Sequence, residues 1–241
     1  MSTSAVNTLL TALRTGQATS PALIWYGSSG ERIELSGKVL DNWVAKTSNF
    51  LVDELDAEPG LRVRLELPVH WKSLVWILAA WQTGCTVVLG SGGGPAAVTA
   101  SAAADAAAEG TAVAVALGAL DLSYPEDLPA GVVDYAAEIR SYADTFVADG
   151  EAGPGVAALE VNGTTGSRRL TGTLTYGDLP LQDGSDARPE VLLAASADLP
   201  LVLEGALEAW ASGGTVVLTP AGEEPSPRLL ESERVTKRLA A

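Results

Sequence analysis

The sequence predicts an α/β fold, with a doubly wound parallel sheet followed by a second, partial α/β subdomain. Short apolar segments alternate with helical segments along most of the chain, as they do in α/β proteins. Several of these segments, such as residues 85–90 (CTVVLG), are uniformly apolar, which is typical of parallel strands covered on both faces. With 241 residues, 47% of them hydrophobic, the chain is long enough to bury a sizeable core.

The first subdomain is expected over residues 1–150, and its elements follow from local patterns. An amphipathic helix is predicted within residues 1–16, and Ser36 is the expected N-cap of a later helix. The remaining predicted elements are strands at 22–27 and 32–37, a strand at 61–67, a helix at 71–83, a strand at 85–90, an alanine-rich helix within 95–110, a strand at 111–117 and a strand near 132–135.

The second subdomain is expected over residues 151–241, because residues 148–155 (ADGEAGPG) have the composition of a boundary. Its predicted elements are strands at 156–161 and 190–195, a helix at 201–211, a strand at 214–220, a helix at 227–234 and a last strand at 235–239. That last strand would leave an unprotected sheet edge, which favours dimerisation or the binding of another protein chain.

Charge and composition exclude several classes of partner. The formal net charge is −15, from 30 acidic and 15 basic residues, so nucleic acids and anionic membrane surfaces are rejected as partners. The start of the chain does not read as a signal peptide, and no apolar run reaches the roughly 18 residues of a membrane helix. The single cysteine, Cys85, suits a reducing compartment. We therefore expect a cytoplasmic protein.

Other chemistry-bearing residues give weaker signals. His70 is the only histidine, and without a G-x-S-x-G segment it predicts no catalytic triad. One histidine and one cysteine also exclude a typical zinc site. The glycines of residues 90–94 fail the dinucleotide fingerprint, whose third glycine would fall at Pro95, so a flexible connection is favoured. Trp76 is expected to point away from the apolar face of its helix and is a candidate subunit or partner contact.

The segment with the strongest functional signal is residues 162–179 (NGTTGSRRLTGTLTYGDL). Small residues let backbone N–H groups approach phosphate oxygens, and hydroxyls supply further donors. Arg168 and Arg169 could bind an anion in a bidentate manner. The competing interpretation is an ordinary glycine- and threonine-rich connection between strands, with both arginines in solvent. A third is the structural relic of a phosphate loop, and all three stay open.

The order of these segments resembles the AMP-binding, adenylate-forming superfamily. That superfamily includes acyl-CoA synthetases, luciferases and the adenylation domains of peptide synthetases. The resemblance runs in the same order through nearly the whole chain. Its segments are residues 58–68 (EPGLRVRLELP), residues 82–90 (QTGCTVVLG), residues 157–179, which contain GTTG, residues 190–220 and residues 226–241. More narrowly, the chain resembles short actinobacterial proteins that have distant similarity to AMP-binding enzymes and no assigned activity.

The resemblance implies that the loop once gripped the β- and γ-phosphates of ATP. It implies ATP or AMP with Mg²⁺ as cofactors and assigns no catalytic residue and no metal ligand. The Pro-Lys-Gly usual after GTTG is replaced by Arg168 and Arg169 with an insertion, and the family's later motifs would fall beyond Ala241. The vestigial phosphate- or nucleotide-binding residues carried over are Gly163, Thr164, Thr165, Gly166, Ser167, Arg168 and Arg169.

The expected function is therefore that of a non-catalytic binding or interaction protein with at most weak affinity for a nucleotide or an acyl ligand. Its expected partner is a second copy or another protein, bound through the sheet edge. Two alternatives stay open: an ATP-dependent acid ligase of the acyl-CoA synthetase type, completed by a partner chain, and a purely structural oligomer.

Overall fold

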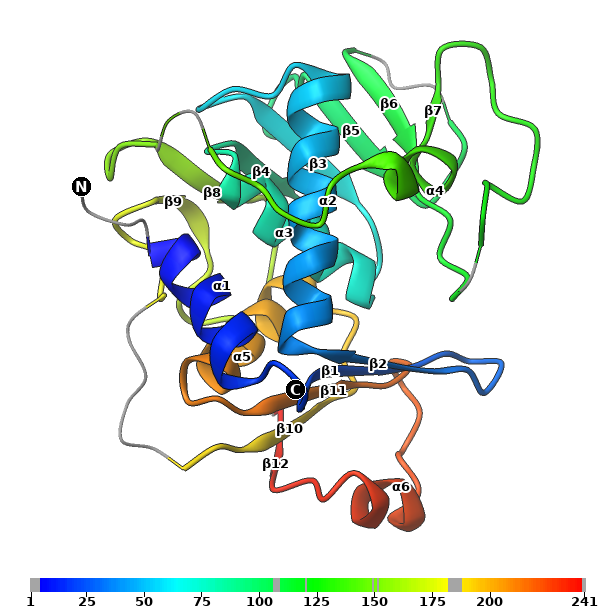
Figure 1. Cartoon of the computed structure of the whole chain (residues 1–241), viewed down its shortest axis with the longest axis vertical. Helices are drawn as coiled ribbons and strands as arrows, with labels where there is room; N and C mark the ends of the chain where they lie inside the picture. The colour runs from blue at the N-terminus through cyan, green and yellow to red at the C-terminus, as the bar shows by residue number, and fades with distance from the viewer. Residues whose placement is uncertain are drawn as a thin grey trace.

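The computed structural model describes residues 5–105, 109–119, 121–148, 150, 152–181 and 188–239. Its strands form a seven-stranded and a five-stranded sheet, which Figure 1 shows one above the other with helices between them. Both sheets consist mainly of parallel strands. The predicted α/β fold class is confirmed.

The seven-stranded sheet has the order β7-β6-β5-β3-β4-β8-β9. All neighbouring strands in it pair in parallel except β8 and β9, which form an antiparallel pair. The strands are β3 (Arg62–Glu66), β4 (Thr86–Leu89), β5 (Val98–Ser101), β6 (Thr111–Ala114), β7 (Val133–Asp134), β8 (Ala157–Val161) and β9 (Gly172–Thr175).

The five-stranded sheet has the order β12-β10-β11-β1-β2 and joins the two ends of the chain. β1 pairs in parallel with β11, with Leu23 opposite Val216, and forms an antiparallel hairpin with β2. The strands are β1 (Pro21–Tyr26), β2 (Arg32–Ser36), β10 (Val191–Ala194), β11 (Thr215–Leu218) and β12 (Lys237–Arg238).

The division between the sheets does not coincide with the boundary expected near residue 150. β1 and β2 come from residues 1–150 but lie in the sheet built mostly from residues 151–241, whereas β8 and β9 lie in the other sheet. Part of the expected boundary, at residues 149 and 151, lies outside the described residues. The division into domains 1–150 and 151–241 stays a prediction.

Helices fill the space between the two sheets (Figure 1). The central one, α3, contacts β4 of one sheet and β1 of the other, so it is buried on every side from Trp71 to Trp81. Such a helix has no outward face. These helices are α1 (Ala5–Gly16), α2 (Gly37–Leu55), α3 (Trp71–Gln82) and α5 (Leu199–Ala211).

The burial of α3 corrects the expectation for Trp76. Its side chain is fully buried and packs edge-on against Phe50, with ring centroids 6.0 Å apart. It therefore cannot be an exposed contact for a subunit or partner. The sequence prediction placed Trp76 on a solvent-facing side of the helix. A helix between two sheets has no such side.

The alanine-rich helix expected within residues 95–110 is also wrong where the structure describes it. Val98–Ser101 forms β5, which pairs in parallel with β3 and β6. Alanine has a high intrinsic helix propensity, but tertiary context overrides it. Here the β-branched Val98 and Thr99 and a position between two strands decide the outcome.

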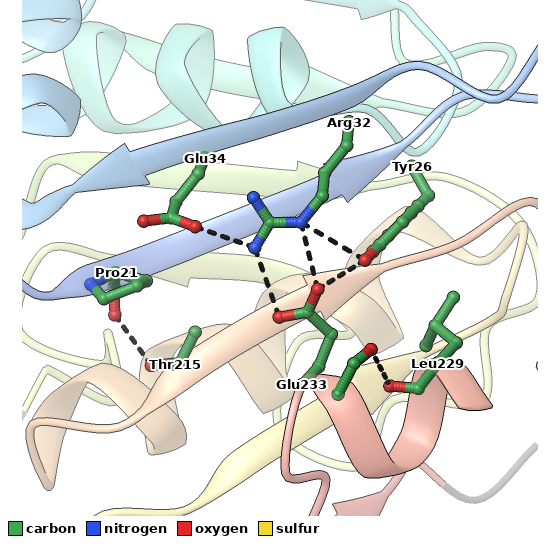
Figure 2. Close-up of polar contacts among 8 residues, drawn as sticks. Pro21, Tyr26, Arg32, Glu34, Thr215, Leu229 and Glu233 are labelled. Carbon is green, nitrogen blue, oxygen red and sulfur yellow. Dashed lines mark hydrogen bonds and ion pairs between the residues drawn. The ribbon is translucent and has the colours of Figure 1, made fainter. Parts of the chain in front are cut away.

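The outer face of the five-stranded sheet is partly covered by α6 (Pro227–Ser232). Figure 2 shows how Glu233, directly after this helix, is bound to the β1–β2 hairpin. Arg32 Nε lies 3.0 Å from Glu233 Oε1, Arg32 Nη2 lies 2.7 Å from Glu34 Oε2, and the Tyr26 hydroxyl donates to Glu233. Burial opposes ionisation of Glu233, but the hydrogen bonds from Arg32 and Tyr26 prevail and lower its pKa. These contacts fasten the last helix to the first hairpin.

Candidate functional site

The glycine–threonine loop, residues 162–171, connects the antiparallel strands β8 and β9. It begins at the carboxyl end of β8, where the backbone N–H of Asn162 donates to Leu89 O at 2.9 Å. Ligands of parallel α/β sheets bind outside the carboxyl ends of the strands. The loop is therefore placed where a ligand could be bound, and its contacts decide whether its donors are accessible.

The first half of the loop is bound to Asp198, the N-cap of α5. The Thr165 hydroxyl donates to Asp198 Oδ1 at 2.8 Å, and Gly166 N donates to Asp198 Oδ2 at 2.6 Å. Leu201 N, in the first turn of α5, donates to the same carboxylate at 3.0 Å. Burial opposes ionisation, but the hydrogen bonds from Gly166, Leu201 and Thr165 outweigh it and lower the pKa of Asp198. An ionised carboxylate thus occupies this part of the loop.

The second half of the loop is bound to Glu204, farther along the same helix. Glu204 Oε2 accepts hydrogen bonds from the Ser167 hydroxyl, from Arg168 N at 2.9 Å and from Arg169 N at 3.3 Å. The Ser167 hydroxyl in turn accepts from Leu170 N at 2.8 Å, and both residues are buried. A side-chain carboxylate therefore receives three converging donors of the kind that bind phosphate oxygens in anion-binding loops.

The side chains of the two arginines do not enter this arrangement. Arg168 and Arg169 are exposed, and Arg169 Nη1 is 3.9 Å from Glu208 Oε1, a distant and solvent-screened ion pair. Gly163 and Thr164 are exposed as well. Of the seven predicted residues, the structure brings Thr165, Gly166, Ser167 and the backbone of Arg168 and Arg169 onto helix α5. Their role in phosphate binding stays a prediction.

Sequence reasoning missed Asp198 and Glu204. Asp198 had a signal, because an aspartate two residues before a proline at a helix start is a typical N-cap. Glu204 had none, since one acid on a helix looks like any other in a chain with 30 acidic residues. Its function depends on where the loop folds back, which is a tertiary contact.

A second glycine-rich loop, residues 90–94, follows β4 and is held by two arginines of β3. Arg64 donates to Gly90 O at 3.2 Å, to Gly92 O at 2.8 Å and to Gly94 O at 2.7 Å. Arg62 donates to Gly93 O and lies 2.6 Å from Glu160 Oε2. The next element is strand β5, not a helix, so this loop presents no helix N-terminus to an anion. The flexibility expected of this loop stays a prediction.

The other candidate residues have local roles. His70 is buried, and its Nδ1 accepts from Lys72 N at 3.1 Å, which caps α3. Burial and the nearby charge of Lys72 lower the pKa of His70 to about 3, so its imidazole is neutral. Burial raises the pKa of the Cys85 thiol to about 11, which removes its nucleophilic form at neutral pH. No group of three potential metal-binding side chains occurs among the described residues.

The helices within the described ranges include none that is long and apolar enough to span a membrane. Comparison with family models finds no match. A curated relative, a TIGR03089 family protein of Mycobacterium tuberculosis strain H37Rv, is 32% identical over an alignment of 231 residues that covers 91% of this chain and 89% of the relative.

Solved structures of adenylate-forming enzymes share the fold. The acyl-CoA synthetase of Brucella canis matches 98% of this chain with a TM-score of 0.73 and 16% identity. The acetoacetyl-CoA synthetase of Streptomyces lividans matches 98% with a TM-score of 0.70 and 16% identity. The chain spans 47% and 42% of their respective lengths, about half of each.

The α/β architecture, with two mainly parallel sheets, thus agrees with these solved structures. The chain belongs to the TIGR03089 family, and it has the fold of the N-terminal region of the adenylate-forming enzymes.

Proposed function

We propose that this protein is a non-catalytic relative of the adenylate-forming enzymes, which acts in the cytoplasm by binding rather than by catalysis. The observation that carries the proposal is the occupation of the glycine–threonine loop by the carboxylates of Asp198 and Glu204. The donors expected to bind ATP phosphates already have anionic acceptors from the same chain.

A phosphate group entering this loop would meet a strong electrostatic penalty. It would have to displace Glu204 from Ser167, Arg168 and Arg169, or lie beside it as a second anion. Like charges a few ångströms apart repel by about 1–4 kcal/mol at effective dielectric constants of 80 to 20. The donor set therefore does not fit ATP or AMP with Mg²⁺ in this arrangement, and we assign no adenylation step to it.

The binding function requires a partner, and we propose the sheet edge at β12 as the contact. β12 pairs with β10 on one side, with Leu192 opposite Lys237 and Leu193 opposite Arg238. No other described strand pairs with its opposite side. An edge of this kind can add a strand from another chain. A second copy of this chain is the simplest candidate, and size measurement in solution over a concentration series tests it.

The proposal is tested by calorimetric titration of the full chain with ATP and AMP, each with and without Mg²⁺. We expect no binding at millimolar nucleotide. The Glu204→Ala variant removes the competing carboxylate, and Glu208→Ala is its matched control on the outer part of the same helix.

Micromolar binding by the unmodified protein would overturn the proposal, provided that Thr165→Ala/Arg168→Ala/Arg169→Ala abolishes it. That result would favour the alternative of an acid ligase completed by a partner chain. An oligomer without any ligand would instead favour a purely structural role.

A further inference from the structure

A cavity of about 200 Å³ lies at the carboxyl edge of the seven-stranded sheet, among segments that do not include the glycine–threonine loop. Lys72 reaches it from the first turn of α3, which follows β3. Asp121 comes from the loop after β6, and Tyr135 and Arg140 come from the short helices after β7. Trp43 of α2 completes one wall. The segments that follow β3, β6 and β7 of one parallel sheet thus line this cavity.

The charges around the cavity are opposite to the balance of the whole chain. Acidic residues outnumber basic ones by 30 to 15 over the sequence. The cavity is lined by three bases, Lys46, Lys72 and Arg140, and by one acid, Asp121. Two of the four lysines of the chain are among them. Asp144 offsets Lys46 and Asp121 acts on Lys72, so Arg140 is the base that has no carboxylate partner among the described residues.

Lys72 is the best-placed of the three bases. Only 4% of the residue is exposed, and its Nζ donates to Ala116 O and, at 3.0 Å, to Gly118 O. An ammonium group has three donors, and no oxygen or nitrogen acceptor among the described residues takes the third, although the Trp71 ring centroid lies 5.4 Å from Nζ. Burial lowers the pKa of Lys72 to about 8. The charge of Asp121 raises this pKa, and the charge of Arg140 lowers it. The group therefore stays mainly charged at pH 7.

The other two bases are held less tightly. Lys46 donates to Tyr142 O, and its Nζ lies 2.8 Å from Asp144 Oδ1. Arg140 is exposed and forms no ion pair with a residue that the structure describes. Its guanidinium can therefore turn toward a ligand without breaking an existing pair.

The walls of the cavity are apolar and partly aromatic. Tyr135 and Ile139 are buried, and Trp43 is half-buried. The Tyr135 hydroxyl is bonded to the Thr47 hydroxyl at 2.7 Å, so its ring, and not its polar end, is what it offers to a ligand. A few charged groups above an apolar body are the usual make-up of a small-molecule site.

We propose that this cavity binds a small organic anion, namely a carboxylate on a compact aromatic or branched aliphatic body. The carboxylate would lie against Lys72 and Arg140, and the apolar body would pack between Trp43 and Ile139. The volume lies below the range of about 300–1,000 Å³ for sites that hold drug-sized ligands, so a nucleotide is too large. The site extends the proposed binding function but does not depend on the state of the glycine–threonine loop.

The test is a titration of the full chain with benzoate, followed by calorimetry and by amide chemical shifts. We expect saturable 1:1 binding with a Kd of about 1 mM or lower, the range that a ligand of this size can reach. Benzamide, which has the same shape without the charge, is expected to bind at least tenfold more weakly. Absence of saturation up to about 20 mM benzoate, or equal affinity for benzamide, would overturn the proposal.

Variants locate the site. Arg140→Gln, at an exposed position, is expected to weaken benzoate binding at least threefold, and Ala119→Leu is expected to abolish it by filling the cavity without a change of charge. Lys38→Gln, an exposed lysine outside the cavity, is the matched control and should leave the Kd unchanged.

Loss of binding in Lys72→Met with a retained fold would add to the support, and unfolding of that variant leaves the Arg140 and Ala119 results to decide. If neither Arg140→Gln nor Ala119→Leu changes the Kd, the proposal is wrong. A failed benzoate titration would leave the nucleotide titration unaffected, so the two proposals can fail separately.

Discussion

The two glycine-rich loops lie after neighbouring strands of one sheet, yet each is held by charges of the opposite sign. In residues 90–94 the backbone carbonyls accept hydrogen bonds from Arg62 and Arg64. In the glycine–threonine loop the backbone N–H groups donate to Asp198 and Glu204. A glycine-rich loop is a set of oriented peptide dipoles, and the side chains nearby decide whether those dipoles remain available to a ligand.

The loops also meet each other, because Asn162 lies between them. A Cβ on Gly90 would overlap Asn162 O, and one on Gly93 would approach the amide of the Asn162 side chain. The loop after β4 is therefore packed against the start of the glycine–threonine loop, whereas Gly163 has no heavy atom near its Cβ position.

The largest effect is expected from Gly90→Ala. Gly90 has a φ of 80°, a conformation that costs alanine about 1–3 kcal/mol, and the overlap with Asn162 O adds about 1–3 kcal/mol. Gly163→Ala, at a φ of 104° with open space around it, should show only the backbone cost. Urea unfolding of both variants measures the difference. Equal losses of stability would show that the two loops are not packed as described.

The next effect is expected from Glu204→Ala. The change leaves the buried Ser167 hydroxyl without its carboxylate and removes the acceptor of two backbone amides, so we expect a loss of about 1–3 kcal/mol. Glu208→Ala removes only exposed, distant ion pairs and should change stability by less than about 0.5 kcal/mol. Chemical denaturation measures both. If the two variants are equally stable, Glu204 does not hold the loop.

A smaller effect is expected from Arg64→Lys in the other loop. The lysine keeps the charge but cannot span the three carbonyls that the planar guanidinium reaches. We expect a loss of about 1 kcal/mol and faster hydrogen exchange of amides in residues 90–94, with no change in the glycine–threonine loop. Native-state hydrogen exchange resolves the two loops. A lysine variant with unchanged exchange would mean that charge alone stabilises this loop.

The smallest effect is expected from acid. The folded-state pKa of Asp198 lies below that of the unfolded chain, so its contribution to stability is complete above the unfolded pKa and is lost as pH falls through the folded one. The three acceptors of Arg64 are carbonyls, which do not titrate. Below pH 4 the amide signals of Gly166 and Thr165 should therefore shift, while that of Gly92 should not. Asp198→Asn should abolish the shift, and its persistence would point to another group.

Much of the fold could be predicted from sequence because its strands are short, apolar and bounded by glycine or proline. The strands β4, β10 and β11 all lie within largely apolar runs. β5 was missed because its alanines have the local preference of a helix, and only the strands beside it decide otherwise. The place of β1 could not be predicted, since its partner β11 lies at the other end of the chain.

The candidate site was only half predictable, for a related reason. The glycine–threonine loop is a local feature and its sequence marks it. The carboxylates of Asp198 and Glu204 reach it from a helix more than thirty residues away, and a sequence does not show which acid will meet which amide. The cavity around Lys72 is assembled from four separate segments and had no sequence signal at all.

The pairing of β1 with β11 has a consequence for the order in which the protein is made. Leu23 leaves the site of synthesis long before its partner Val216 exists. At about 5–20 residues per second, roughly 10–40 s separate the two. During that interval the apolar residues of the β1–β2 hairpin lack their sheet, and an unpaired apolar strand is prone to wrong association. The nascent chain is therefore most vulnerable to aggregation at its beginning, and chaperones that act on ribosome-bound chains should recognise this hairpin first.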